Sequence, residues 1–175
     1  MKYKDAVKQS MEMLARDEKT VFIGYNITRG SRAYGSLNNI PLEKCLETPV
    51  AENLMAGLSI GMSLERYNPV LIFERQDFML NALDALVNHL DKIESLSKGE
   101  FIPKVIVRAI VGSKKPINPG PQHMQDFSKF FKEFLHFPVY DSQTSQEVID
   151  NYIEALASKR PSMMIERKDL YERNN

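Results

Sequence analysis

Five short apolar runs alternate with longer stretches of helical character along this 175-residue chain. The expected strands are Thr20–Ile23, Val70–Phe73, Val105–Val107, Pro138–Tyr140 and Met163–Ile165. The expected helices cover residues 4–16, 48–65, 81–95, 126–134 and 145–158. Short apolar strands that alternate with helices are typical of a parallel sheet covered on both faces. The pattern therefore predicts a three-layer α/β fold with a mostly parallel sheet, and we expect one domain over residues 1–175.

The composition excludes several classes of partner. The 23 basic and 23 acidic residues cancel, so no overall field attracts nucleic acid or an anionic membrane. Cys45 is the only cysteine, which excludes an internal disulfide and suits a reducing compartment. No apolar run approaches the ~20 residues that cross a bilayer. These features predict a soluble cytoplasmic domain, and they do not indicate its chemistry.

Glu52 is the first candidate functional residue. Thr48 is expected to cap a helix and Pro49 to occupy its first position, which places Glu52 one turn into the helix. A capping-box glutamate would stand one position earlier, where the chain has Ala51. The helix is largely apolar, and an unpaired carboxylate beginning a buried helix is costly. Glu52 is therefore either a functional carboxylate or a first-turn acid that complements the helix dipole.

His123 is the second candidate. It ends a loop over residues 112–122 that is rich in proline and glycine, where a proton-handling group could lie, although loop histidines are often inert. His89 and His136 are expected to be structural or solvated. The spacing of these residues supports no metal site, and no glycine-rich phosphate loop or nucleophile elbow is present.

Several sequence blocks resemble a known family when they are taken in order. Thr48-Pro49-Val50-Ala51-Glu52 resembles the Thr-Pro-Ile-Ser/Ala-Glu helix in the β subunits of the E1 components of pyruvate and branched-chain 2-oxoacid dehydrogenases. Asn68-Pro69-Val70, Asp77-Phe78 and Gln122-His123-Met124-Gln125 follow that family's pattern at its spacing. The resemblance extends from Ala6 to about Tyr171.

The resemblance implies a transketolase-type pyrimidine-binding domain that uses thiamine diphosphate. Glu52 would then be a catalytic residue that hydrogen-bonds N1′ of the aminopyrimidine ring of the cofactor. Phe78 matches the aromatic residue that stacks on this ring, although its alternative role is core packing. His123 matches the catalytic histidine that faces the reacting centre. Glu74 falls in the segment next to the pyrimidine and is a further cofactor-binding candidate, and no metal ligand is expected on this chain.

Three segments differ from the family pattern, and they concern the substrate more than the cofactor. Glu74-Arg75-Gln76 replaces a mainly apolar stretch, and Tyr25-Asn26 replaces an acidic pair after the first strand. The loop over residues 113–121 is longer and carries Lys114 and Lys115, which could meet an anion or simply be solvated.

The resemblance also implies that this chain is half of an enzyme. None of its eight glycines is followed by aspartate, so the Gly-Asp-Gly…Asn motif that holds Mg²⁺ and diphosphate is missing, and the family's carboxy-terminal domain is not expected here. A separate diphosphate-binding α-type subunit would complete an α2β2 enzyme that decarboxylates a 2-oxo acid or transfers a two-carbon or acyl unit from a 2-oxo acid or ketose. Gly57 and Gly61 would permit close helix packing in a dimer. The alternative is a non-catalytic assembly or regulatory subunit.

Overall fold

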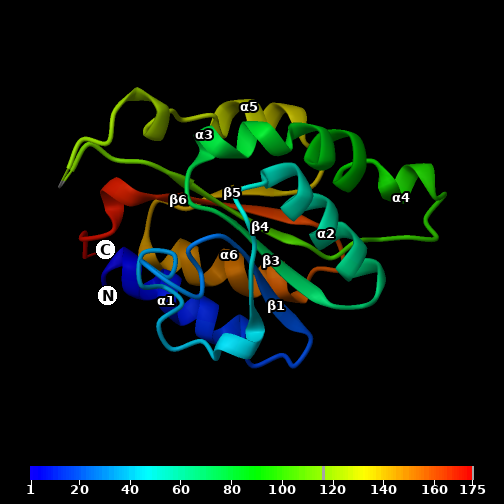
Figure 1. Ribbon diagram of the computed structural model, residues 1–175, viewed down its shortest axis with the longest axis horizontal. Coiled ribbons are helices and arrows are strands. Elements are labelled where there is room, and N and C mark those ends of the chain that lie inside the picture. The colour runs from blue at the N-terminus through cyan, green and yellow to red at the C-terminus, as the bar shows by residue number, and fades with distance from the viewer. Residues whose placement is uncertain (116, 175) are drawn as a thin grey trace.

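A computed structural model describes residues 1–115 and 117–174, and it has the three layers expected from the sequence. Six strands form one sheet in the order β2-β1-β3-β4-β6-β5 (Figure 1). Every strand pair is parallel, so the predicted, mostly parallel α/β fold is confirmed. The strands are β1 (Thr20–Gly24), β2 (Cys45–Glu47), β3 (Asn68–Phe73), β4 (Ile106–Val111), β5 (Val139–Asp141) and β6 (Ser162–Arg167).

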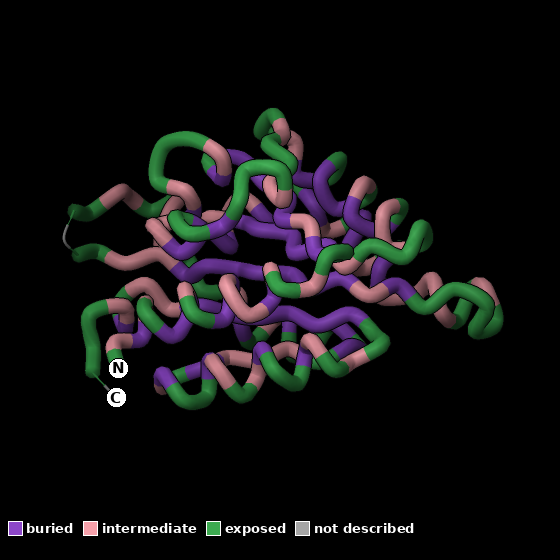
Figure 2. The backbone as a smooth tube through the Cα atoms, turned by 90° about the horizontal axis from the view of Figure 1, so that it is seen from below, coloured by how far each residue is buried: buried purple, intermediate pink, exposed green. Residues whose placement is uncertain are grey.

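Helices cover both faces of the sheet. On one face lie α1 (Tyr3–Leu14) and α6 (Ser145–Ala157), and on the other lie α2 (Glu52–Leu64), α3 (Gln76–Met79), α4 (Ile93–Leu96) and α5 (Ser128–Phe134) (Figure 1). Successive strand residues point to opposite faces. Leu71 therefore packs under α2 and α3, whereas Val70 and Ile72 pack over α1 and α6. The buried strands lie between two layers of half-exposed helices (Figure 2).

The predicted helix over residues 81–95 is interrupted in the structure, so this prediction was wrong as a continuous α-helix. The chain passes from α3 through a 3-10 turn, η2 (Leu80–Ala82), into a π-helical segment, η3 (Asp84–Leu90), before α4. The wider π-helical turns keep Ala85, Leu86 and Leu90 buried against the sheet. Periodicity alone cannot distinguish such turns from a regular α-helix.

The short edge strand β2 was not predicted. Its three residues, Cys45–Glu47, include no β-branched side chain, so the sequence gives no strand signal there. The strand forms because it pairs with β1, in the register Phe22↔Cys45. A 3-10 turn, η1 (Leu42–Lys44), leads into it. Two further 3-10 turns follow β4 and β6, namely η4 (Pro121–His123) and η5 (Lys168–Leu170).

The two ends of the chain lie side by side (Figures 1 and 2). Lys2 bridges to Asn174, and the Tyr3 N–H donates to the Arg173 carbonyl at 3.0 Å. Glu172 accepts from the ammonium groups of Lys2 and Lys4 at 2.8 and 2.5 Å. These contacts hold the segment after β6 against α1.

Candidate functional site

Buried polar atoms without partners mark one edge of the sheet. Among the described residues, six buried side-chain atoms make no hydrogen bond: Tyr25 Oη, Thr48 Oγ1, Arg75 Nε, Asp77 Oδ2, His123 Nδ1 and Ser162 Oγ. The first five lie on the segments that follow β1, β2, β3 and β4. The carboxyl ends of parallel strands share one edge, which is where such folds bind ligands. Each unmade hydrogen bond costs roughly 1–3 kcal/mol, so a cluster of five indicates a binding site.

The path of the chain from β2 into α2 delivers Glu52 to this edge. The Thr48 N–H donates to the Gly24 carbonyl at 2.9 Å, which extends the pairing with β1. Pro49 then disfavours a helical conformation at Thr48. The helix begins at Glu52 with Ala51 as an N-cap that makes no side-chain bond. The predicted Thr48 cap and a position one turn into the helix were therefore wrong, and Glu52 is the first helical residue.

Glu52 is buried at the positive end of α2. Its residue exposure is 5%, and it takes part in no ion pair among the described residues. The free N–H groups and the dipole of the helix favour negative charge at this position. The Glu52 side chain makes no ion pair with the described residues, so its acceptor atoms stay available to a ligand.

Tyr25 lies beside Glu52 and was not among the predicted site residues. Burial raises the pKa of Tyr25 well above its usual value, and the nearby charges of Glu52 and then Glu74 raise it further. Its hydroxyl has no partner, although the residue is only 6% exposed. The signal in the sequence was its place directly after β1, where the family resemblance expects an acid.

Glu74 is held by the loop that follows β1. Its carboxylate accepts from Asn26 Nδ2 at 3.1 Å and from Ser31 Oγ at 3.0 Å. Both oxygens are thus engaged within the chain, and Glu74 orders this loop. A contact between Glu74 and a cofactor stays a prediction.

Phe78 and His123 are far apart in the sequence and meet in the structure. Their ring centroids are 5.2 Å apart with an interplanar angle of 85°, an edge-to-face contact. Two hydrogen bonds hold the His123 loop on α3: Gln125 Nε2 donates to Asp77 Oδ1 at 2.9 Å, and the Phe127 N–H donates to Gln76 Oε1 at 2.7 Å. The histidine is therefore positioned by the same helix that carries Phe78.

Gly112 explains how the loop can return over the end of β4. A Cβ at this position would lie 1.7 Å from the His123 carbonyl oxygen, a distance no side chain tolerates. The backbone of His123 therefore packs directly on Gly112. The segment from β3 to α3 carries both Glu74, which contacts the loop after β1, and Phe78, which contacts His123.

The other histidines lie outside this site. His89 is 3.5 Å from Asp84 with a side chain that is 60% exposed. His136 precedes β5 at the opposite edge, where its Nδ1 lies 2.8 Å from Asp91. Among residues 1–115 and 117–174, no group of three possible ligands could hold a metal ion, and no helix is long and apolar enough to span a membrane.

Comparisons with known proteins extend the geometric argument. A β subunit of mitochondrial pyruvate dehydrogenase E1 from Saccharomyces cerevisiae is 26% identical over 98% of this chain and 48% of its own length. The corresponding subunit of Rickettsia conorii is 23% identical over 96% of this chain and 52% of its own length. A solved structure described as a split-gene transketolase, inactive β4 tetramer, superposes with a TM-score of 0.75 at 12% identity, over the whole chain and 53% of its own. The chain therefore has the fold of this split-gene transketolase structure.

The sequence similarity of the chain to these E1 β subunits is distant and spans nearly its whole length. The domain covers about half the length of the curated relatives that it matches. No protein-family model matches it. The comparisons therefore support the fold and a distant relationship. They do not establish the activity or the partners of this chain.

Proposed function

We propose that this chain is the pyrimidine-binding subunit of a split, cytoplasmic, thiamine-diphosphate-dependent enzyme that acts on a 2-oxo acid or a ketose. The unsatisfied buried polar atoms on the segments after β1, β2, β3 and β4, at the sheet edge that carries Glu52, support the proposal. A ring that brings its own donors and acceptors would satisfy these atoms, which include the hydroxyls of Tyr25 and Thr48. The aminopyrimidine of thiamine diphosphate is such a ring.

Each candidate residue has a role that fits its place. Glu52 would bind N1′ of the ring and share a proton with it. Phe78 would pack on the ring, and His123 would orient the substrate or move a proton through its unpaired Nδ1. Glu74 would support the ring pocket through the loop after β1. Thiamine diphosphate, when bound, supplies the carbon nucleophile that attacks the substrate carbonyl.

A second subunit would complete this site. The chain lacks a Gly-Asp-Gly motif, and its described residues offer no cluster of metal ligands, so Mg²⁺ and the diphosphate would be held by an α-type subunit. We propose an α2β2 enzyme with its active site at the subunit interface. In isolation the chain would form a homodimer or a larger homo-oligomer.

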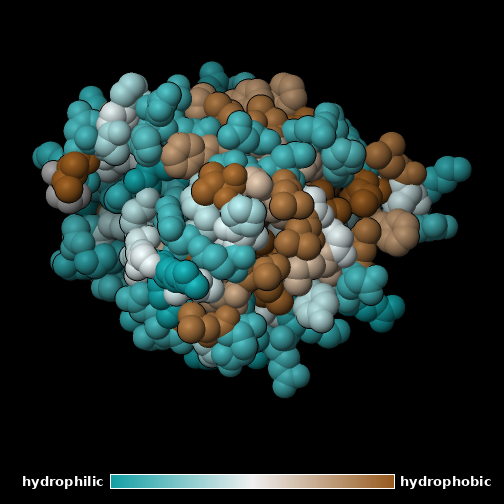
Figure 3. Space-filling model, viewed as in Figure 1, coloured by the Kyte–Doolittle hydropathy of each residue, from teal (hydrophilic) through white to brown (hydrophobic). Residues whose placement is uncertain are grey.

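An exposed face of α2 fits such an assembly. Leu54 and Leu64 are 58% and 38% exposed, and no atom lies within 4 Å of a Cβ placed at Gly57 or Gly61. Apolar side chains gather over α2 in Figure 3. Small residues four apart let a second helix approach closely. We expect Leu54→Glu to shift the isolated chain toward monomer in sedimentation experiments, whereas Leu96→Glu on α4 should leave the assembly unchanged.

Reconstitution tests the proposed function. The companion chain would be identified by co-purification and then mixed with this chain, thiamine diphosphate and Mg²⁺ in a calorimeter. We expect cofactor binding that needs both subunits, followed by turnover in a panel of 2-oxo acids and ketoses. Glu52→Gln and Phe78→Ala should weaken binding and abolish or strongly reduce turnover, whereas the exposed Glu133→Gln should not. Wild-type affinity and full turnover in both site variants would refute the assignment.

The alternative is a non-catalytic assembly or regulatory subunit. It is favoured by one observation, since a solved structure with this fold is described as an inactive β4 tetramer. This alternative predicts a stable complex with a companion chain that lacks the Gly-Asp-Gly…Asn motif, and no turnover in the substrate panel.

A further inference from the structure

Arg75 is a buried cation without a counterion. The residue is 7% exposed, and it forms no ion pair with any carboxylate among the described residues. Its guanidinium donates to the Tyr34 hydroxyl and, at 2.6 Å, to the Glu74 carbonyl, while Nε has no partner. The neighbouring Glu74 carboxylate accepts its side-chain hydrogen bonds from Asn26 and Ser31 and not from Arg75, although its charge acts on Lys168 nearby. A buried, unpaired charge is costly unless an anion completes it.

Lys168 brings a second cation to the same place. Its ammonium lies 4.2 Å from the ring centroid of Tyr34, and the Arg75 guanidinium carbon lies 5.0 Å from that centroid. Burial lowers the pKa of Lys168, and the charge of Arg75 lowers it further. Two cations therefore share one aromatic ring.

A strained backbone holds Tyr34 in this position. Arg32, Ala33 and Tyr34 have φ values of +46°, +51° and +58°, a left-handed run that residues other than glycine rarely adopt. The Arg32 guanidinium stabilises the run by donating to the carbonyls of Ile27, Asn38 and Ile40. Strain that the surrounding structure maintains is typical of binding sites.

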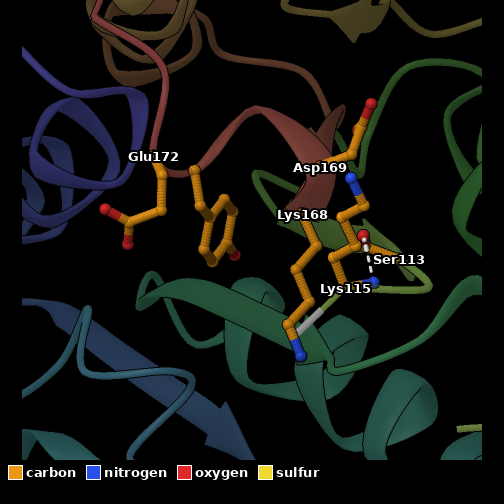
Figure 4. Close-up of a pocket in the computed structure, with 6 residues that line it drawn as sticks. Ser113, Lys115, Lys168, Asp169 and Glu172 are labelled. Atoms are coloured by element: carbon orange, nitrogen blue, oxygen red, sulfur yellow. Dashed lines mark hydrogen bonds between the residues drawn. The ribbon is translucent and has the colours of Figure 1, made fainter. Parts of the chain in front are cut away.

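A cavity of about 740 Å³ opens at Lys168. It is lined by Ser113, Lys115, Lys168, Asp169, Tyr171 and Glu172 (Figure 4). Glu172 is paired with Lys2 and Lys4, and Asp169 is exposed. In Figure 4 the Lys168 side chain extends away from both acids. The volume suits a small substrate.

We propose that Arg75 and Lys168, which both contact the Tyr34 ring, form an oxyanion-binding site that receives the carboxylate or phosphate terminus of a small ligand from this cavity. Arg75 supplies a planar fork of donors that matches an oxyanion, and Lys168 supplies a point charge. That this anion is the terminus of a substrate rests on the proposed function. Arg75 belongs to a segment that departs from the family pattern, so the site would be a specificity feature of this chain.

Anion titration of the purified chain tests the proposal. Inorganic phosphate and pyruvate are titrated separately at constant ionic strength while the Arg75 Nε–H and nearby backbone amides are followed by NMR. We expect saturable shifts, with Arg75→Gln and Lys168→Met each weakening the affinity about tenfold or more. Lys159→Met removes an exposed lysine at the opposite edge of the sheet and should leave the affinity unchanged.

The outcomes separate the sources of the anion. Binding of phosphate alone supports a phosphate ester as ligand, and binding of pyruvate alone supports a carboxylate. Wild-type shifts that do not saturate with either anion would overturn the site, as would undiminished affinity in a folded Lys168→Met variant. The experiment needs neither cofactor nor companion subunit. If the chain binds the anions but never forms a cofactor-binding complex, the anion site stands and the proposed function is refuted.

Discussion

Replacing Arg108 with methionine should strongly destabilise the fold. Arg108 is fully buried in the centre of β4 and forms two hydrogen bonds with Glu166 of β6, at 2.5 and 2.9 Å. Its third bond reaches Ser36 Oγ at 2.7 Å in the loop after β1. Glu166 also accepts from the hydroxyls of Tyr152 and Tyr171, at 3.0 and 3.1 Å. The network joins the sheet to the segments that carry Tyr34 and Lys168.

The expected loss of unfolding free energy follows from the Glu166 charge that Arg108→Met leaves without its partner. In Arg108→Met the Glu166 carboxylate stays buried, with 1% residue exposure, and retains only two tyrosine donors. Breaking one side of such a buried pair costs about 3–5 kcal/mol. For a domain of this size, that loss lowers Tm by roughly 6–20 °C. Removing both charges in Arg108→Met/Glu166→Met eliminates the uncompensated carboxylate, so the double variant should be less destabilised than the sum of the single variants.

Urea unfolding followed by circular dichroism measures these free energies for the wild type, both single variants and the double variant. A loss below about 1 kcal/mol in Arg108→Met would contradict the cost assigned to a buried charge. Strict additivity in the double variant would also refute the reasoning, because it would show that the two side chains are not coupled.

Three further predictions concern the site and its surroundings. Gly112→Ala should cost about 1–3 kcal/mol and shift the NMR signals of His123 and Phe78, since its Cβ would collide with the His123 carbonyl; a wild-type Tm in this variant would contradict the close approach. Tyr25→Phe should raise the free energy of unfolding of the isolated chain by about 1 kcal/mol, because it removes a buried hydroxyl without a partner; a loss of stability would show that the hydroxyl is satisfied. Burial alone would raise the pKa of Asp141, but hydrogen bonds from Arg167 and Lys132 outweigh burial and hold that pKa below its usual value. Because the folded pKa is the lower one, the stabilisation by Asp141 is present above about pH 4 and is lost as the pH falls through the folded pKa. Stability measured against pH should therefore fall less steeply at acid pH in Asp141→Asn, and an unchanged slope would refute this origin.

The sequence by itself determined the layers of the fold. Alternating short apolar runs and helical stretches are local patterns, and the alternation of Val70, Leu71 and Ile72 between the two faces follows from strand geometry. The order of the sequence motifs is sufficient to identify Glu52, Phe78 and His123 as candidate site residues. Their roles toward a cofactor stay predictions.

The tertiary structure decided where α2 begins, which distant residues meet and which charges are buried, because local sequence patterns do not contain this information. Thr48 resembled a helix cap, but its N–H pairs with Gly24 across the sheet and the helix starts at Glu52 instead. The contact between Phe78 and His123 depends on hydrogen bonds between residues 48 positions apart and on the missing side chain of Gly112. In the sequence, Arg75 is one charged residue in a polar triplet, and only its burial without an ion pair among the described residues supports the proposed anion site. Burial and pairing are set by packing between distant segments, which a single sequence does not record.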